Sequence, residues 1–283
     1  MNRPAGRFPS GGAMILRQVR YQGLTFLRTP VAVFFTILLP LIMLVLFNVL
    51  FGNGDVDTGS GTWRYSQFYV GAIAAFTAVS ATFTNLANIV PIRRDEGVLK
   101  RWRGTPLPPW TYIGGTIATT FVIALASVIV TLVLGIAAYG VRIEPAKVPA
   151  MVVTFFVGVV SFAALGMAVA GLCQTASSAS AVANVIVLPM AFISDIFIAL
   201  EDPPGWLDTL GDVLPLKPFA QSFQDTLNPA VDAPAFDLGR LALVAAWGVV
   251  GAVVAVRWFK WEPARTGRTR RRRRSRARVE AAA

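Results

Sequence analysis

The chain has 283 residues, of which 55% are hydrophobic and only 14% are charged. Soluble domains carry roughly 25% charged residues, so the composition excludes an ordinary soluble domain and indicates a polytopic membrane protein. Histidine is absent and Cys173 is the single cysteine, which excludes histidine-based catalysis, the usual zinc sites and an intrachain disulfide. We therefore expect no catalytic residue, no metal site and no cofactor bound by this chain.

Six apolar runs are long enough to cross a bilayer, which takes about 20 residues in a helix. Helices are required there because lipid cannot satisfy exposed backbone groups. Pro91 marks the expected end of the second run. The predicted spans are residues 31–51, 68–90, 111–139, 148–172, 179–200 and 238–256. The sequence thus predicts an all-α membrane protein with one transmembrane domain over residues 1–264.

The distribution of lysine and arginine predicts that both termini face the cytoplasm. The segment before the first span holds five arginines and no acid, and the loop after the second span holds five basic residues. The segment after the sixth span is the most basic, whereas the remaining loops are acidic or mixed. Because basic loops stay inside, we expect a multi-pass protein of the cell inner or plasma membrane.

Residues 15–28 have helical periodicity ahead of the first span. At about 100° per residue, an apolar face and a polar face separate, although Arg20 lies off the polar face. The expected apolar face consists of Ile15, Leu16, Val19, Phe26 and Leu27. This pattern predicts an interfacial helix on the inner leaflet, with Thr29-Pro30 turning the chain into the membrane. A basic flank without a special role is the alternative.

The loop at residues 93–109 is an amphipathic, charged segment between two predicted spans. Three apolar side chains, Val98, Leu99 and Trp102, are embedded among its charges. This combination predicts a contact surface for a partner on the cytoplasmic side. An ordinary basic loop that only fixes topology is the alternative.

Few polar residues lie inside the predicted spans. Asp195 is the only acid in one, and a charge at mid-bilayer costs about 2.5–3.5 kcal/mol. Asp195 either lines a substrate path or outer gate with Ser194, or lies at the outer interface, hydrated or paired with Arg240. Asn85 and Asn88 share a face of the second span, where they either bridge helices or line the path. The candidate path residues are Asn85, Asn88, Ser194 and Asp195.

Residues 201–237 form the longest predicted external segment. Prolines break it repeatedly, and residues 206–213 and 219–227 are each predicted to form a short helix. Their apolar side chains suggest that the segment dips back into the interface. We expect either a cap over the outer end of a pathway or a packed lid.

The basic tail at residues 265–283 includes the uninterrupted run Arg270 to Arg274. Each basic residue near an anionic leaflet contributes about 1 kcal/mol, so binding to anionic lipids is the leading interpretation. No aromatic or folded platform accompanies the run, so we expect no nucleic-acid partner. A disordered topology anchor without a partner is the third possibility.

Three regions carry a resemblance to a known family. Residues 94–107 resemble the loop R-x-E-G-T-L-x-x-L-x-x-T-P-L, residues 188–194 resemble L-P-x-x-F-x-S, and residues 197–207 with 214–216 resemble the external segment that follows. In order and spacing they resemble type-2 ATP-binding-cassette (ABC) exporter permeases, close to the daunorubicin-resistance-like transmembrane subunits. Val98 replaces the usual Thr, Trp102 the usual Leu and Asp195 the usual Gly, and the arginine-rich tail lies outside the pattern.

The resemblance implies a transport mechanism. Two permeases, identical or paralogous, pair above two copies of an ABC ATPase, which binds ATP and Mg because this chain has no phosphate loop. Closure of the ATPases moves the coupling loop, whose apolar residues dock in a groove while Glu96 and Arg101 pair with charges at its rim. The implied coupling residues are Arg94, Glu96, Gly97, Val98, Leu99, Arg101, Trp102, Thr105 and Pro106.

The family resemblance leaves the substrate open. A hydrophobic or amphipathic drug, antibiotic or lipid-like compound is the leading expectation, and a lipid-linked glycan or other envelope component is the alternative. Two other classes are weaker. A lipid-modifying membrane enzyme needs clustered acids or histidines, whereas Asp202, Asp208 and Asp212 are spaced like a solvated face. A secondary transporter needs inverted repeats, which we do not find.

Overall fold

The computed structural model describes residues 11–52, 54–57, 61–103, 109–197 and 204–259. Six helical segments in these ranges are long and apolar enough to cross a membrane. They are Pro30–Phe51 (α2 Pro30–Val33, η1 Phe34–Leu38, α3 Leu39–Phe51), Tyr65–Asp95 (α4 Tyr65–Val79, η2 Ser80–Thr84, α5 Asn85–Asp95), Thr111–Tyr139 (in α7 Pro109–Tyr139), Pro145–Leu172 (η3 Pro145–Lys147, α8 Val148–Leu172), Ala176–Ile193 (α9) and Leu238–Trp258 (α12). The prediction of six spanning helices is confirmed.

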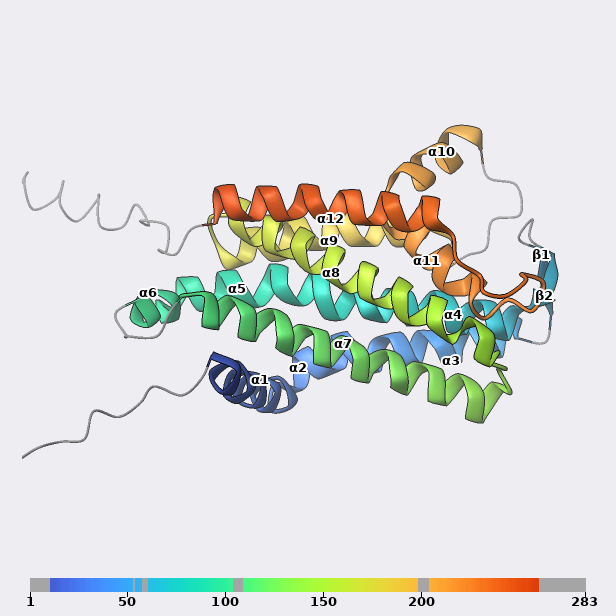
Figure 1. Ribbon diagram of the computed structural model, residues 1–283, viewed down its shortest axis with the longest axis horizontal. Helices are drawn as coiled ribbons and strands as arrows, with labels where there is room; N and C mark the ends of the chain where they lie inside the picture. Colours follow the sequence, from blue (N-terminus) through green and yellow to red (C-terminus); the bar gives the residue numbers. More distant parts are fainter. Residues whose placement is uncertain (1–10, 53, 58–60, 104–108, 198–203, 260–283) are drawn as a thin grey trace, which may run out of the picture.

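Shorter elements lie at the two ends of this bundle (Figure 1). At one end are α1 (Gly11–Leu27) and α6 (Val98–Arg103), and we call it the α6 end. At the other are α10 (Gly205–Val213), α11 (Leu216–Asp225) and the antiparallel hairpin of β1 (Asp55–Asp57) and β2 (Thr62–Arg64), which we call the α10 end. The two short helices predicted within residues 201–237 are confirmed, whereas the hairpin was not predicted.

Two predicted boundaries are wrong. The second span does not end before Pro91 but continues to Asp95, with Pro91 inside α5. A proline removes one backbone donor, and contacts of the next turn with neighbouring helices hold the helix together. The fifth span does not reach Leu200, because α9 ends at Ile193 and Asp195 adopts a left-handed conformation with φ of 55°. Residues 198–200 of the predicted span lie outside the described residues.

The second span is the centre of the bundle. Its membrane-length window is 89% buried, compared with 22% for the first span and 28% for the third, fifth and sixth. Small residues such as Ala72, Ala74 and Ala75 are fully buried in α4, which lets neighbouring helices approach it closely. The other helices therefore pack around α4, η2 and α5 and leave apolar surface outward.

The fourth and sixth spans pack closely against each other. A Cβ atom added at Gly248 lies 2.8 Å from Ser161 Cα, and one added at Gly251 lies 2.8 Å from the Leu165 backbone nitrogen. Any larger side chain at these positions pushes α8 and α12 apart. The two glycines thus set the distance between the helices.

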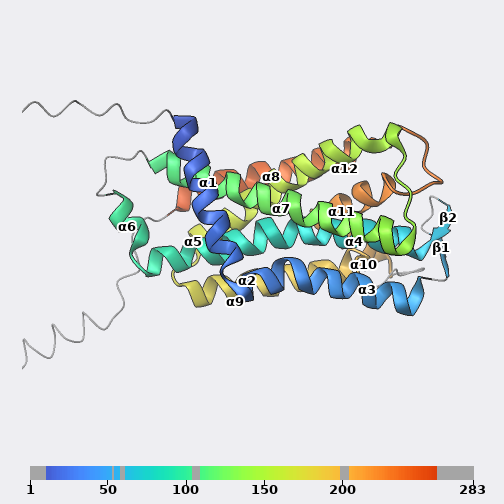
Figure 2. The same cartoon turned by 90° about the horizontal axis from the view of Figure 1, so that it is seen from below.

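Helix α1 crosses the bundle steeply instead of running along it (Figure 2). The helix itself agrees with the prediction, and its place on the inner leaflet stays a prediction. Gln22 and Phe26 are buried, whereas Leu16 and Leu27 of the predicted apolar face are 70% and 65% exposed. Polar contacts of Gln22 with its neighbours, described below, decide this orientation.

Candidate functional site: the junction at the α6 end

The α6 end is built around a sharp turn between α5 and α6. Helix α5 ends at Asp95, and Gly97 follows in a left-handed conformation with φ of 71°. The Gly97 amide donates to the Arg94 carbonyl, and the Arg101 amide donates to the Gly97 carbonyl as α6 begins. Glycine suits this conformation because it has no Cβ. The turn directs α6 away from the spans, where Figure 1 shows it beyond the end of the bundle.

Arg94 is a buried cation at this turn, with 2% of its surface exposed. Its Nη1 donates to the carbonyl of Ala170 at 3.1 Å and its Nη2 to the carbonyl of Cys173 at 2.7 Å. These carbonyls belong to the C-terminal end of α8, where backbone acceptors lack helical partners and carry partial negative charge. Arg94 thus fastens the end of α5 to the end of α8.

Asp95 makes the complementary contact with the next helix. Its Oδ2 accepts a hydrogen bond of 2.7 Å from the backbone amide of Ala176, the first residue of α9. The N-terminus of a helix carries partial positive charge, which favours a carboxylate there. The Asp95 Oδ1 lies 3.9 Å from Arg94 Nε. The pair therefore places a cation on the end of α8 and an anion on the start of α9.

Arg93 reaches a third group of neighbours. Its Nη1 donates to Gln22 Oε1 of α1 at 3.0 Å and to the Tyr112 hydroxyl of α7 at 3.3 Å. Gln22 Nε2 in turn donates to Thr116 Oγ1 of α7 at 3.1 Å. Successive helical residues point about 100° apart, so three consecutive residues at the end of α5 contact four different helices, α1, α7, α8 and α9.

The predicted coupling residues occupy several environments. Glu96 and Arg101 are exposed and Val98 is half-buried, so these side chains remain available to a partner. Arg94 and Leu99, by contrast, are buried within this chain, and Leu99 has no exposed surface. The Trp102 side chain, Thr105 and Pro106 lie outside what the structure describes.

The predicted path residues do not form one site. Asn88 Oδ1 accepts a hydrogen bond from Ser180 Oγ of α9, so Asn88 bridges the second and fifth spans. Asn85 is half-buried on the same helix. Ser194 follows Ser180 by 14 positions along α9, which is about 21 Å at 1.5 Å per residue. The asparagines and the Ser194-Asp195 pair therefore lie near opposite ends of the fifth span.

The sequence predicted Asp195 as an acid within the fifth spanning helix, but this helix ends before Asp195. Ser194 caps α9 and donates its hydroxyl to the Met190 carbonyl, and the chain leaves the helix at Asp195. The positive φ of Asp195 is a conformation that glycine favours and that aspartate tolerates better than most residues. Asp195, which stands where the resembled family usually has glycine, therefore occupies a left-handed backbone conformation.

Ion pairs hold the α10 end. Lys217 is buried and binds the carboxylates of Asp208 and Asp212 on α10. Burial lowers the pKa of Lys217, but hydrogen bonds and charges of both carboxylates raise it above its ordinary value. Burial raises the pKa of Asp225, while its ion pair with Arg240, 2.7 Å long, opposes that change.

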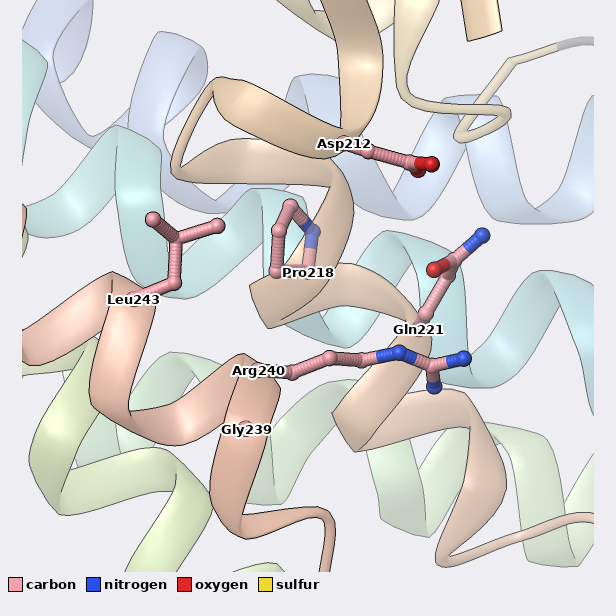
Figure 3. Close-up of a pocket in the computed structure, with 6 residues that line it drawn as sticks. All are labelled: Asp212, Pro218, Gln221, Gly239, Arg240 and Leu243. Atoms are coloured by element: carbon pink, nitrogen blue, oxygen red, sulfur yellow. The ribbon is translucent and has the colours of Figure 1, made fainter. Parts of the chain in front are cut away.

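An open depression of about 280 Å³ lies beside these ion pairs, between α10, α11 and α12 (Figure 3). Asp212, Gln221 and Arg240 line it, together with Pro218, Gly239 and Leu243. It includes none of the predicted path residues. Within the described residues, no group of three or more His, Cys, Asp or Glu side chains is arranged to hold a metal ion.

Sequence reasoning missed several residues of these networks, namely Gln22, Arg93, Asp95, Lys147 and Lys217. Lys147 Nζ donates to the Asn228 carbonyl at 2.8 Å and pairs with Glu144 at 3.0 Å. One signal was present in the sequence for Lys217, which is the only cation in residues 201–237. An isolated charge in apolar surroundings points to a specific internal partner.

Comparison with known proteins gives the family. Residues 14–228 match the family described as ABC-2 type transporter. The chain is also similar to the daunorubicin resistance ABC transporter permease protein DrrB1 of Streptomyces coeruleorubidus, with 29% identity over 230 residues that cover 79% of this chain and 77% of the relative. With its six apolar helices, the chain is a multi-pass membrane protein that belongs to the ABC-2 type transporter family.

Proposed function

We propose that this chain is the permease subunit of an ABC exporter and that α6 is its coupling helix. The observation that carries the proposal is α6 itself, a short helix beyond the end of the bundle with Glu96, Lys100 and Arg101 exposed around it. The α6 end then faces the cytoplasm, where two copies of an ABC ATPase bind ATP and Mg. A second permease, identical or paralogous, completes the assembly.

The proposed orientation has a direct test. The chain has one cysteine, so a Cys173→Ser background allows single cysteines to be introduced. With Lys100→Cys or Ala146→Cys, both exposed positions, a membrane-impermeant maleimide is added to intact cells. We expect labelling of position 146 in intact cells and of position 100 only after lysis. The reverse pattern contradicts the proposed topology.

The proposed ATPase contact is tested by co-purification of the tagged chain with its ABC ATPase. Arg101→Glu reverses a charge on exposed α6, so we expect recovery of the ATPase to fall at least tenfold. Arg142→Glu is the matched control, because Arg142 is exposed between α7 and α8 at the α10 end. Equal recovery with both variants contradicts the assignment of α6.

We further propose that the substrate is a hydrophobic or amphipathic compound, by analogy with the drug-resistance relative. Daunorubicin serves as the probe, in cells that express the chain together with its ATPase. We expect these cells to accumulate less drug than cells carrying the Arg101→Glu variant. Equal drug accumulation in the two kinds of cell, when the ATPase co-purifies with the parent chain but not with the variant, excludes this drug. It favours another cargo, such as a lipid-linked envelope component.

A further inference from the structure

The turn between α8 and α9 is held by two adjacent charges from the end of α5. Arg94 donates to the Ala170 and Cys173 carbonyls on one side of the turn, and Asp95 accepts from the Ala176 amide on the other. Both residues thus satisfy backbone groups that helix ends leave without helical partners. We call these two residues and their three backbone partners the α5 latch.

The chemistry of the latch makes it stiff. The Arg94 guanidinium is almost entirely removed from solvent, and its hydrogen bonds are charge-assisted, which makes them about twice as strong as neutral ones. Moving it away from α8 leaves a buried cation and two carbonyls without partners, which is costly. The end of α5 therefore moves together with the α8–α9 turn.

The latch also lies directly beside α6. Only Glu96 and Gly97 separate Asp95 from the first residue of α6. Within the described residues, the side-chain hydrogen bonds from this turn to the ends of α8 and α9 are those that Arg94 donates and the one that Asp95 accepts. They give a displacement of α6 a short polar route to the fourth and fifth spans, in addition to the packing of α5 against α8 and α9.

We propose that Arg94 and Asp95 are positioning residues for energy coupling, which transmit the movement of α6 to the α8–α9 turn. The inference rests on the proposed function, because it requires that an ATPase moves α6. Neither residue needs to touch the ATPase. Their task is to make the cytoplasmic ends of the fourth and fifth spans follow the coupling helix.

The test follows two positions separately. In the Cys173→Ser background, which keeps the Cys173 carbonyl, an environment-sensitive fluorophore is attached at Lys100→Cys on α6 or at Gln174→Cys in the turn, both exposed. The complex with its ATPase is compared with and without ATP. In the parent, we expect ATP to change the emission at both positions.

Loss of the latch should separate the two signals. With Asp95→Ala, we expect the response at position 100 to persist, while the response at position 174 falls at least threefold. Asp95→Asn keeps an oxygen that accepts from Ala176, so it should retain more than half of the response at 174. Arg94→Met should resemble Asp95→Ala, and Arg20→Met, which removes an exposed arginine of α1, should behave like the parent.

The possible results distinguish the inference from the proposed function. An unchanged response at position 174 in Asp95→Ala overturns the inference while the coupling function stands. No ATP response at position 100 in the parent overturns the proposed function, and the inference with it. If Arg94→Met does not fold, the comparison of Asp95→Ala with Asp95→Asn decides, because Asp95 is partly exposed and both variants keep Arg94 and its two carbonyl acceptors.

Discussion

The two ends of the bundle are fastened by different chemistry. At the α10 end, Lys217 and Arg240 bind carboxylates of Asp208, Asp212, Asp225 and Asp237, which lie within the same segment of the chain. At the α6 end, Arg94 binds backbone carbonyls of a helix 76 and 79 positions away. The α10 end is therefore largely a local cap held by ion pairs, whereas the α6 end joins distant helices through contacts with backbone groups, and those of Arg94 keep their charge.

This difference suggests a division of labour within the proposed transporter. A junction that must pass movement between helices benefits from partners that stay charged, and arginine does not lose its proton in proteins. A cap needs only to hold its own short helices in place. The predictions below test whether the two ends differ in stability, in coupling and in their response to pH.

The largest expected difference concerns the arginine at each end. Arg94→Met leaves two backbone carbonyls without their donor, so we expect the free energy of unfolding to fall by about 2–4 kcal/mol. Arg240→Met removes two partly exposed ion pairs, 37% exposed on the arginine side, and should cost about 1 kcal/mol. Thermal unfolding of both variants in the same detergent measures the difference. Equal losses contradict the view that the α6 end carries the stronger contact.

A second comparison uses two glycines with the same backbone conformation. Gly97 has φ of 71° at the α6 end and Gly140 has φ of 66° at the α10 end, and an added Cβ meets no atom within 4 Å at either. Each change to alanine should therefore cost about 1 kcal/mol from conformation alone. We expect similar losses of thermal stability in both variants.

Only Gly97→Ala should also alter the ATP-dependent response of α6, because Gly97 forms the turn before it. Asparagine tolerates this conformation better than alanine, so Gly97→Asn should restore part of the response. Fluorescence at position 100, measured as above, gives the readout. A matching defect in Gly140→Ala assigns the effect to general instability rather than to the turn.

The sequence predicted the elements much better than their contacts. Apolar runs located all six spans because lipid requires continuous helices. The path of a helix through a proline was harder to predict. Pro91 continues α5, and before Pro40 the first span adopts a π-helical stretch in which the Leu39 amide donates to the Phe34 carbonyl. Neighbouring helices decide such details, and periodicity carries no information about them.

For the candidate site, the sequence located the segment around α6 but not its contacts, and the coupling role of this segment stays a prediction. The segment around α6 was found from its motif, yet Arg94 and Leu99 proved to be buried within the chain. Asp95, which caps α9, was not among the expected site residues at all. Partners separated by about 80 positions cannot be inferred from the spacing of residues within one helix.

The smallest expected effect concerns pH at the α10 end. Burial raises the pKa of Asp225 above its ordinary value of 3.8, so the folded state holds this proton more tightly than the unfolded state. Protonated Asp225 therefore adds to the free energy of unfolding at low pH, and this stabilisation is lost as pH rises from 3.8 through the raised pKa. Asp225→Asn cannot titrate, so its melting temperature relative to the parent should rise with pH across this window.

The control for this prediction is Asp55→Asn, an exposed acid in the hairpin at the same end of the bundle. Its melting temperature relative to the parent should not rise with pH in the way expected for Asp225→Asn. If the melting temperature of Asp225→Asn relative to the parent instead falls as pH rises, attraction to Arg240 outweighs burial in setting the pKa of Asp225. The α10 end would then depend on ionised pairs throughout, and the contrast with the α6 end would lie only in how far along the chain each end finds its partners.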